Sequence, residues 1–154
     1  MIPSLLYHGT VERFEVFERR RSLPIGALGY WFAADPAVAL MVALRKTNSP
    51  VLIEAEVSVI NPLVVERGLR GLVDLFDGEV TPEAVEEMRS KIMADGFDGI
   101  LLNDVIEDGG CTDNVIALHP DQIRILEIKG PMSPEEFELS FKAHRALGSE
   151  SLEL

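Results

Sequence analysis

The 154-residue sequence contains one cysteine and three histidines, and this scarcity limits the sites it can build. Cys111 has no second cysteine with which to form an internal disulfide. No other cysteine or nearby histidine completes a structural zinc set with it, so we expect no metal site. A reducing compartment suits this composition, and we expect a cytoplasmic protein.

Basic residues are also scarce. The chain has 14 lysines and arginines against 26 aspartates and glutamates, which gives a formal net charge of −12. A field of this sign repels nucleic acids and anionic membranes, so we expect no direct binding to either. An anionic ligand would need a local basic patch, and Arg19–Arg21 is the most evident one. A solvated run of charges is the commoner structure for such a triplet.

Long apolar runs are absent. No segment approaches the length of a membrane span, and residues 1–10 lack the basic and apolar regions of a secretory signal. The fingerprints GxGxxG and GxxxxGK[ST] do not occur, so neither phosphate-binding loop is predicted. The carboxylates between Asp95 and Asp113, Asp98 among them, lack the spacing of a calcium loop, and we interpret them as solvated, with residues 103–113 as an acidic loop.

The residues that are present predict one α+β domain in which strands outnumber helices. With 47% apolar and 26% charged residues, a chain of this length can bury a core without a disulfide. Alternating or short apolar runs predict strands at residues 5–7, 30–32, 51–59, 63–65, 99–102, 115–118 and 123–128. Capping residues followed by proline predict helices at residues 36–45, 82–95 and 134–147, with residues 68–78 irregular or partly helical. Strands and helices do not alternate regularly, which argues against a doubly wound sheet.

Five short segments occur in an order that is typical of one known fold. They are YHGT at 7–10, GYWFAADP at 29–36, VSVINPLVV at 57–65, ADGFDGILL at 94–102 and DNVIALHPDQI at 113–123. Together they resemble the ADP-ribosyltransferase fold, and within it the histidine-tyrosine-glutamate branch, which includes diphtheria toxin and the poly(ADP-ribose) polymerases. Within that branch, the sequence is similar to the small ADP-ribosyltransferase-like domains of bacteria and phages. We therefore expect an ADP-ribosyltransferase-like mixed sheet with a few flanking helices at residues 1–130, and a C-terminal helix and tail at 131–154.

The first motif of the resemblance implies roles for three residues. His8 falls at the family's histidine, which hydrogen-bonds a ribose hydroxyl of NAD. The backbone of Gly9 would hold the nicotinamide amide, with Thr10 beside it. An imidazole can donate and accept, and a glycine lets the backbone come close to a planar ligand. On the segment LYHGT alone, a turn histidine at a strand end is the simpler interpretation of His8. The presence of the other segments favours a histidine that binds NAD.

The second motif implies an aromatic wall. The family pattern G-x-Y-F aligns with GYWF, which puts Trp31 at the tyrosine against which nicotinamide stacks, with Tyr30 beside it. An indole can stack on a flat ring and attract a pyridinium cation through its face. The alternative is a tryptophan that only packs in the core. On the next helix, the positions that hold an aromatic and often a hydroxyl residue in the family are apolar here: Ala39, Met41 and Val42.

The third motif implies the largest departure from the family. Its glutamate precedes a strand resembling YVVFDPEQI, and aligning Pro120 and Gln122 places Asn114 at that position. The glutamate hydrogen-bonds the nicotinamide ribose and stabilises an oxocarbenium-like transition state. Asn114 can bond a hydroxyl but carries no charge, and adjacent Asp113 should point to the other face of a strand unless the chain bulges there. A loop-to-strand turn residue is the competing interpretation of Asn114.

The resemblance implies an NAD-dependent mono-ADP-ribosyltransferase, a glycosyltransferase that modifies a protein or another nucleophile. We expect NAD as the substrate, His8 and Asn114 as catalytic residues, and Arg19–Arg21 as a group that could meet the pyrophosphate or a partner acid. Family members without the glutamate tend to transfer one ADP-ribose or to be inactive. A catalytically inactive binding module of a phage or bacterium is therefore the alternative, and a hydrolase that cleaves NAD to nicotinamide is the third.

The predicted helix at residues 134–147 lies beyond the resemblance. Its Phe137, Phe141 and Leu147 could cover the domain, or could contact a partner or a second copy of the chain.

Overall fold

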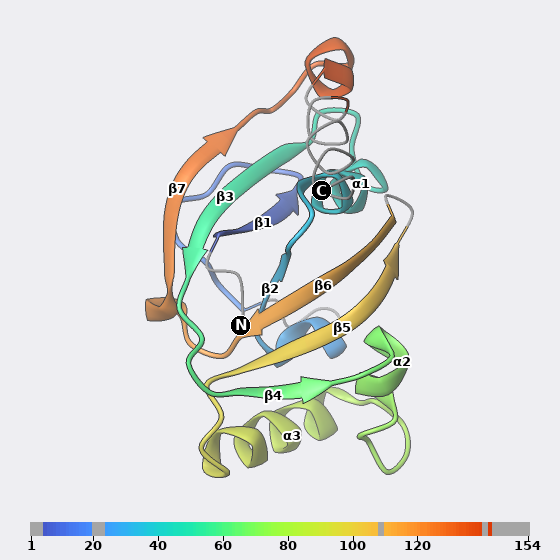
Figure 1. Ribbon diagram of the computed structural model, residues 1–154, viewed down its shortest axis with the longest axis vertical. Coiled ribbons are helices and arrows are strands. Elements are labelled where there is room, and N and C mark those ends of the chain that lie inside the picture. Colours follow the sequence, from blue (N-terminus) through green and yellow to red (C-terminus); the bar gives the residue numbers. More distant parts are fainter. Residues whose placement is uncertain (1–4, 20–23, 108–109, 140–141, 143–154) are drawn as a thin grey trace, which may run out of the picture.

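The computed structural model describes residues 5–19, 24–107, 110–139 and 142. Its centre is one seven-stranded sheet with the order β4-β5-β6-β2-β1-β3-β7 (Figure 1). The strands are β1 (Leu5–Thr10), β2 (Tyr30–Ala33), β3 (Val51–Val57), β4 (Pro62–Val65), β5 (Gly99–Glu107), β6 (Gly110–Ala117) and β7 (Ile123–Lys129). The helices are α1 (Pro36–Leu44), α2 (Gly68–Val73) and α3 (Pro82–Ala94), with short 3-10 helices η1 (Ile25–Leu28) and η2 (Pro120–Gln122). The predicted α+β class is confirmed, because β4 and β5 are parallel whereas the other neighbouring strands are antiparallel.

The predicted starts of two helices are confirmed. The Asp35 carboxylate accepts a hydrogen bond from the Ala37 N–H at 2.8 Å, and the Thr81 hydroxyl accepts one from the Ala84 N–H at 3.1 Å. Both helices have proline in the first turn, where a missing N–H leaves no hydrogen bond unmade. Figure 1 shows α3 alongside β4 at one end of the molecule and α1 toward the opposite end. In the part of the chain that is described, no helix combines the length and apolar character needed to cross a membrane.

The prediction of a solvated acidic loop at residues 103–113 is wrong. β5 and β6 continue through this segment as a hairpin in which Val105 lies opposite Thr112, and both residues are buried. Asp104 lies at an irregularity in the register of β5 and has a positive φ of 61°. This bulge interrupts the inside-outside alternation by which a strand is recognised in a sequence, and so it hid the strand.

β1 is longer than the predicted strand at residues 5–7. It continues to Thr10 because β3 pairs with it along its whole length, from Leu5 opposite Glu56 to Thr10 opposite Val51. His8 therefore lies inside a strand and is not a turn residue at its end.

The sheet is nearly divided between β1 and β2. These strands are in register at one pair, Tyr7 and Ala33, whereas β1 pairs with β3, and β2 with β6, along their full lengths. One face carries a core that includes Leu6, Phe32, Ile53 and Val115. The opposite face carries one core with Ile100, Leu102 and Ile116 and another in which α1 covers Ala33 and Leu52.

The Gln122 side chain connects the residues that follow β6 to two other segments of the chain. Its carboxamide oxygen accepts hydrogen bonds from the N–H groups of Leu118 and His119 at 3.1 and 2.8 Å. Its amide donates to the carbonyls of Ser58 and Asp98 at 2.8 and 2.9 Å. One side chain thus satisfies four backbone groups, which gives this glutamine a structural role.

Asp98 is likewise structural, although the sequence placed it among solvated carboxylates. Its two oxygens accept hydrogen bonds from the N–H groups of Ile60 and Asn61 at 2.9 and 2.8 Å. The Asp98 carboxylate therefore fixes the turn before β4 against the start of β5.

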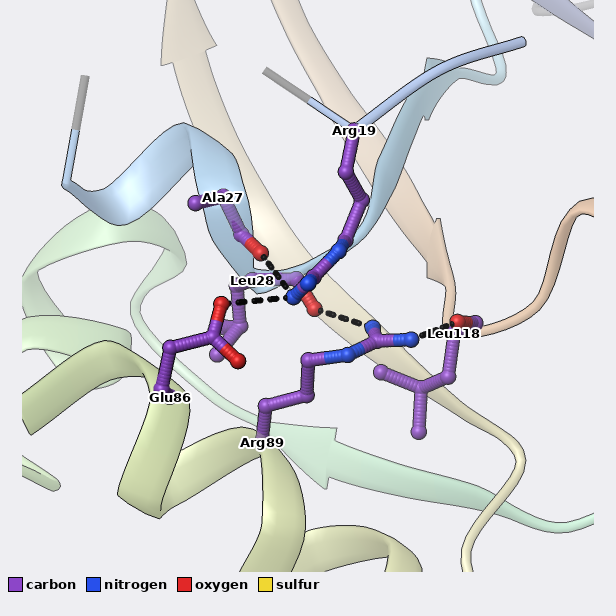
Figure 2. A network of polar contacts seen from close by, with 6 residues as sticks. All are labelled: Arg19, Ala27, Leu28, Glu86, Arg89 and Leu118. Atoms are coloured by element: carbon purple, nitrogen blue, oxygen red, sulfur yellow. Dashed lines mark hydrogen bonds and ion pairs between the residues drawn. The ribbon is translucent and has the colours of Figure 1, made fainter. Parts of the chain in front are cut away.

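Arg89 ties α3 to the sheet (Figure 2). It is 9% exposed, and its guanidinium donates to the carbonyl of Leu28 at 2.9 Å and to that of Leu118. Burial, and then the positive charge of Arg19, lower the pKa of Arg89, while Glu86 acts in the opposite direction. The two carbonyl contacts offset the cost of removing this charge from water, and they join α3 to η1 and to the end of β6.

The start of the predicted C-terminal helix is confirmed. Residues 134–139 are helical, and the Ser133 hydroxyl accepts a hydrogen bond from an N–H of the first turn at 3.2 Å. Phe137 packs against the core under α1. Phe141 and Leu147 lie outside the described residues, so the partner contact predicted for this helix stays a prediction, as does the division between domain and tail.

We expect Gln122→Glu to lower the free energy of unfolding by about 1–3 kcal/mol, because the variant has no amide to donate to the Ser58 and Asp98 carbonyls. Urea denaturation measures this difference. Asp121→Asn, at the exposed neighbouring position, controls for a change of one charge and should alter the value by less than about 0.5 kcal/mol. Equal unfolding energies for Gln122→Glu and the wild type would contradict the structural role.

We expect Arg89→Met to lower the free energy of unfolding by about 2–4 kcal/mol, because two carbonyls lose a charged donor. Lys91→Met removes the same charge from an exposed position of the same helix and should cost less than about 1 kcal/mol. Denaturation curves measure the free energy of unfolding of both variants. Similar decreases in the two would show that the loss of charge, and not the loss of hydrogen bonds, destabilises Arg89→Met.

Candidate functional site

A pocket of about 580 Å³ lies where β1 and β2 diverge. Its walls come from the last residues of β1, the first residues of β2, the segment 11–19 and the end of α1. Five of the residues predicted from the sequence line it: His8, Gly9, Thr10, Tyr30 and Trp31. The fold thus brings the first two motifs to one place, although 18 residues separate them in the sequence.

His8 is held in one orientation. Its Nδ1 lies 2.7 Å from the Trp31 carbonyl oxygen, and because a carbonyl only accepts, Nδ1 carries the proton of this bond. The bond joins the two strands just beyond the point where their ladder ends. The rings of Phe14, Phe17 and Phe32 lie around the imidazole, with centroids 5.9, 5.2 and 5.8 Å away. In this tautomer a neutral ring has its acceptor lone pair on Nε2, which suits a bond from a hydroxyl.

Gly9 is required by packing. A Cβ at this position would lie 1.8 Å from the carbonyl oxygen of Ala39 in α1, so only glycine lets α1 lie directly on β1. Among the apolar helix residues noted in the sequence, Ala39 contributes its backbone carbonyl to this contact, and Val42 lines the pocket. Thr10 lines the pocket too but is only 3% exposed.

Tyr30 and Trp31 line the pocket from opposite faces of β2, as the alternation of a strand requires. The Tyr30 ring is buried edge-on against Phe17, with centroids 6.2 Å apart. Trp31 is half-buried and packs against the core of Ile100 and Ile116. Trp31 therefore packs on the core and also lines the pocket, and the nicotinamide contact predicted for it stays a prediction.

Asn114 does not line the pocket. It lies opposite Ala33 on one side and Leu102 on the other, and its Oδ1 is buried with no hydrogen-bond partner among the described residues. By register, its side chain shares the face of Trp31, whereas His8 packs against Phe32 on the other face. The ribose contact predicted for Asn114 stays a prediction.

Asp113 is exposed, and its Oδ1 accepts a hydrogen bond from the Asp104 N–H at 3.2 Å. The bulge of this hairpin lies in β5 and not at Asp113, so the expectation that Asp113 points away from the Asn114 face holds. Within residues 5–139, gaps in the description aside, no cluster of three histidine, cysteine or acidic side chains could hold a metal ion.

Apart from Arg19, which the sequence analysis considered for an anionic ligand, the charged residues of the pocket were missed by the sequence analysis. Glu12, Glu18 and Lys46 line it, and so does Arg19, whose side chain is 14% exposed and lies 2.8 Å from the Glu86 carboxylate. The interpretation of a solvated charge run is therefore wrong for Arg19 (Figure 2). The segment 11–19 forms neither a helix nor a strand, and no sequence signal placed Glu12, Glu18 and Lys46 at a pocket.

The comparisons with known proteins agree with this geometry. A family described as ADP-Ribosyltransferase in polyvalent proteins (ART-PolyVal) matches residues 2–130. The crystal structure of the M. tuberculosis MbcT-MbcA toxin-antitoxin complex is similar in fold, with a TM-score of 0.51 and 14% identity over 88% of this chain and 87% of that one. No curated protein matches the chain. The predicted resemblance and fold are confirmed, and the chain belongs to the ADP-ribosyltransferase domains of polyvalent proteins, a family of transferases that use NAD as substrate.

Proposed function

We propose that this protein transfers a single ADP-ribose from NAD to a nucleophilic group of another protein. The observation that carries the proposal is the pocket at the β1–β2 divergence, which gathers His8, Gly9 and Thr10 on one side and Tyr30 and Trp31 on the other. A volume of about 580 Å³ lies within the usual range for small-molecule sites.

In the proposed complex the nicotinamide ring stacks on Trp31, and its amide bonds the backbone of Gly9. The indole face attracts the positive charge of the nicotinamide ring, and this attraction weakens once neutral nicotinamide leaves. His8 bonds a ribose hydroxyl through Nε2 while its Nδ1 stays on the Trp31 carbonyl. The bond between C1′ and nicotinamide breaks, and the acceptor's nucleophile bonds C1′ and gives up its proton.

The proposed rate enhancement comes from positioning, because no carboxylate stands at the family's glutamate position. A dissociative reaction of this kind still gains from holding the ribose and the acceptor in line. Transfer of one unit is the expected outcome, since the resemblance associates loss of the glutamate with single additions. A protein acceptor or partner is supported by the similar fold of a toxin crystallised with its antitoxin.

Calorimetry should show saturable NAD binding that weakens at least about tenfold in His8→Ala and in Trp31→Ala, because each variant removes one wall of the pocket. Trp31→Phe keeps an aromatic face and should retain most of the affinity. His119→Ala changes an exposed histidine outside the pocket and serves as the control. Absence of binding at millimolar NAD would refute the proposal.

The second candidate is a binding module that retains the fold without catalysis, and the place of Asn114 outside the pocket favours it.

With NAD labelled in the adenylate and protein acceptors present, we expect single ADP-ribose adducts, with one nicotinamide released per adduct and both lost in His8→Ala. Mass spectrometry and nicotinamide release measure the two products. Bound NAD that is never cleaved would support the module instead, and nicotinamide release without adducts would identify a hydrolase.

A further inference from the structure

Two buried polar atoms in the described chain have no hydrogen-bond partner, and they are complementary. One is Nε1 of Trp31, which can only donate, and the other is Oδ1 of Asn114, which can only accept. Buried polar groups in folded proteins almost always find a partner, because an unmade hydrogen bond is costly away from water. An unpaired donor and an unpaired acceptor in the same region can avoid this cost if a hydrogen bond or a bridging water connects them.

The register of the sheet places the two residues as diagonal neighbours. Trp31 lies opposite Ile116 and Ala33 lies opposite Asn114 in the antiparallel pair of β2 and β6. Directly opposed residues point to the same face, and so do alternate residues of one strand, so Trp31 and Asn114 share a face. Diagonal pairs are about 7–8 Å apart between Cα atoms, a separation that an indole and a carboxamide can span.

On this face of β5 and β6, the described residues next to Asn114 offer it no other partner of this kind. Ile116 and Leu102, which flank Asn114 on that face, are apolar and fully buried. Thr112 is the next residue of β6 on the same face, and its hydroxyl already accepts from the Asp35 N–H at 3.1 Å and donates to the Asp113 carbonyl at 3.2 Å. The described polar group best placed for the indole is therefore the Asn114 carboxamide.

We infer that Asn114 is a positioning residue that acts through Trp31, with one water that accepts a hydrogen bond from the indole N–H and donates one to the carboxamide oxygen. These two hydrogen bonds fix the plane of the indole, which forms a wall of the pocket. An uncharged acceptor suits this buried place better than a carboxylate, which would lose its hydration without a cation to pair with. As a role in NAD binding, the inference rests on the proposed function.

The single tryptophan makes the contact directly observable, because the chain gives one indole N–H signal in a proton-nitrogen spectrum. Asn114→Leu should move that signal upfield and shift the fluorescence emission to shorter wavelength, since the indole loses its acceptor. Asn114→Asp keeps an acceptor oxygen and should retain the downfield signal. Asn103→Leu makes the same change of side chain on the neighbouring strand β5 and should leave the signal in place.

If Asn114→Leu does not fold, Asn114→Ala makes the same test without added bulk. An indole signal that stays at the wild-type position in both variants would overturn the hydrogen bond. This measurement needs no ligand, so its result is separate from that of the proposed function.

A double-mutant cycle on NAD affinity tests the positioning role. Asn114→Leu should weaken NAD binding about threefold to tenfold in the wild-type background, and less than about twofold in the Trp31→Phe background, where the indole N–H is already gone. Equal losses in both backgrounds would show that Asn114 contacts NAD without Trp31 and would overturn the inference. If the wild type binds no NAD, the proposed function fails and the positioning role fails with it, while the spectra still decide the hydrogen bond.

Discussion

The separation of β1 from β2 after a single registered pair is the constraint on which the site depends. Strands that stayed in register would put residues 8–10 against residues 30–32 and leave no space between them. Instead the strands part beyond Tyr7 and Ala33, and the pocket lies between the diverging ends. The hydrogen bond from His8 to the Trp31 carbonyl crosses this gap, so the histidine is both part of the wall and a link between the two strands.

Two helices hold the diverging strands from outside. α1 lies directly on β1 because Gly9 has no side chain, and the Ala39 carbonyl occupies the space a Cβ would need. α3 holds the other strand indirectly, through the contacts of Arg89 with the carbonyls of Leu28 and Leu118 (Figure 2). Leu28 lies just before β2, so this contact fixes the approach to Trp31. The positions of the pocket walls are therefore set by packing on both sides.

The site combines retained and changed features of its family. Histidine, glycine and threonine stand together at the pocket, whereas the aromatic wall is an indole and the third motif carries a carboxamide. The third change is the most consequential, because Asn114 shares a face with Trp31 and not with His8. A chain can keep a substrate pocket in this way while altering what supplies charge to the transition state, which is why fold membership leaves the reaction to be tested.

The sequence by itself determined those features that depend on residues close together in the chain. Caps such as Asp35 and Thr81 begin helices through bonds within one turn, and the alternation in residues 51–57 and 123–129 identifies strands, because these signals need no distant partner. The order of the motifs also predicted the family and five residues of the pocket. Only the tertiary structure showed that β5 and β6 continue past the bulge at Asp104, that Arg19 lines the pocket, and that Asn114 faces Trp31's side of the sheet. These features depend on which strands pair and in which register, and a register shift of one residue exchanges the two faces, so no local pattern could have fixed them.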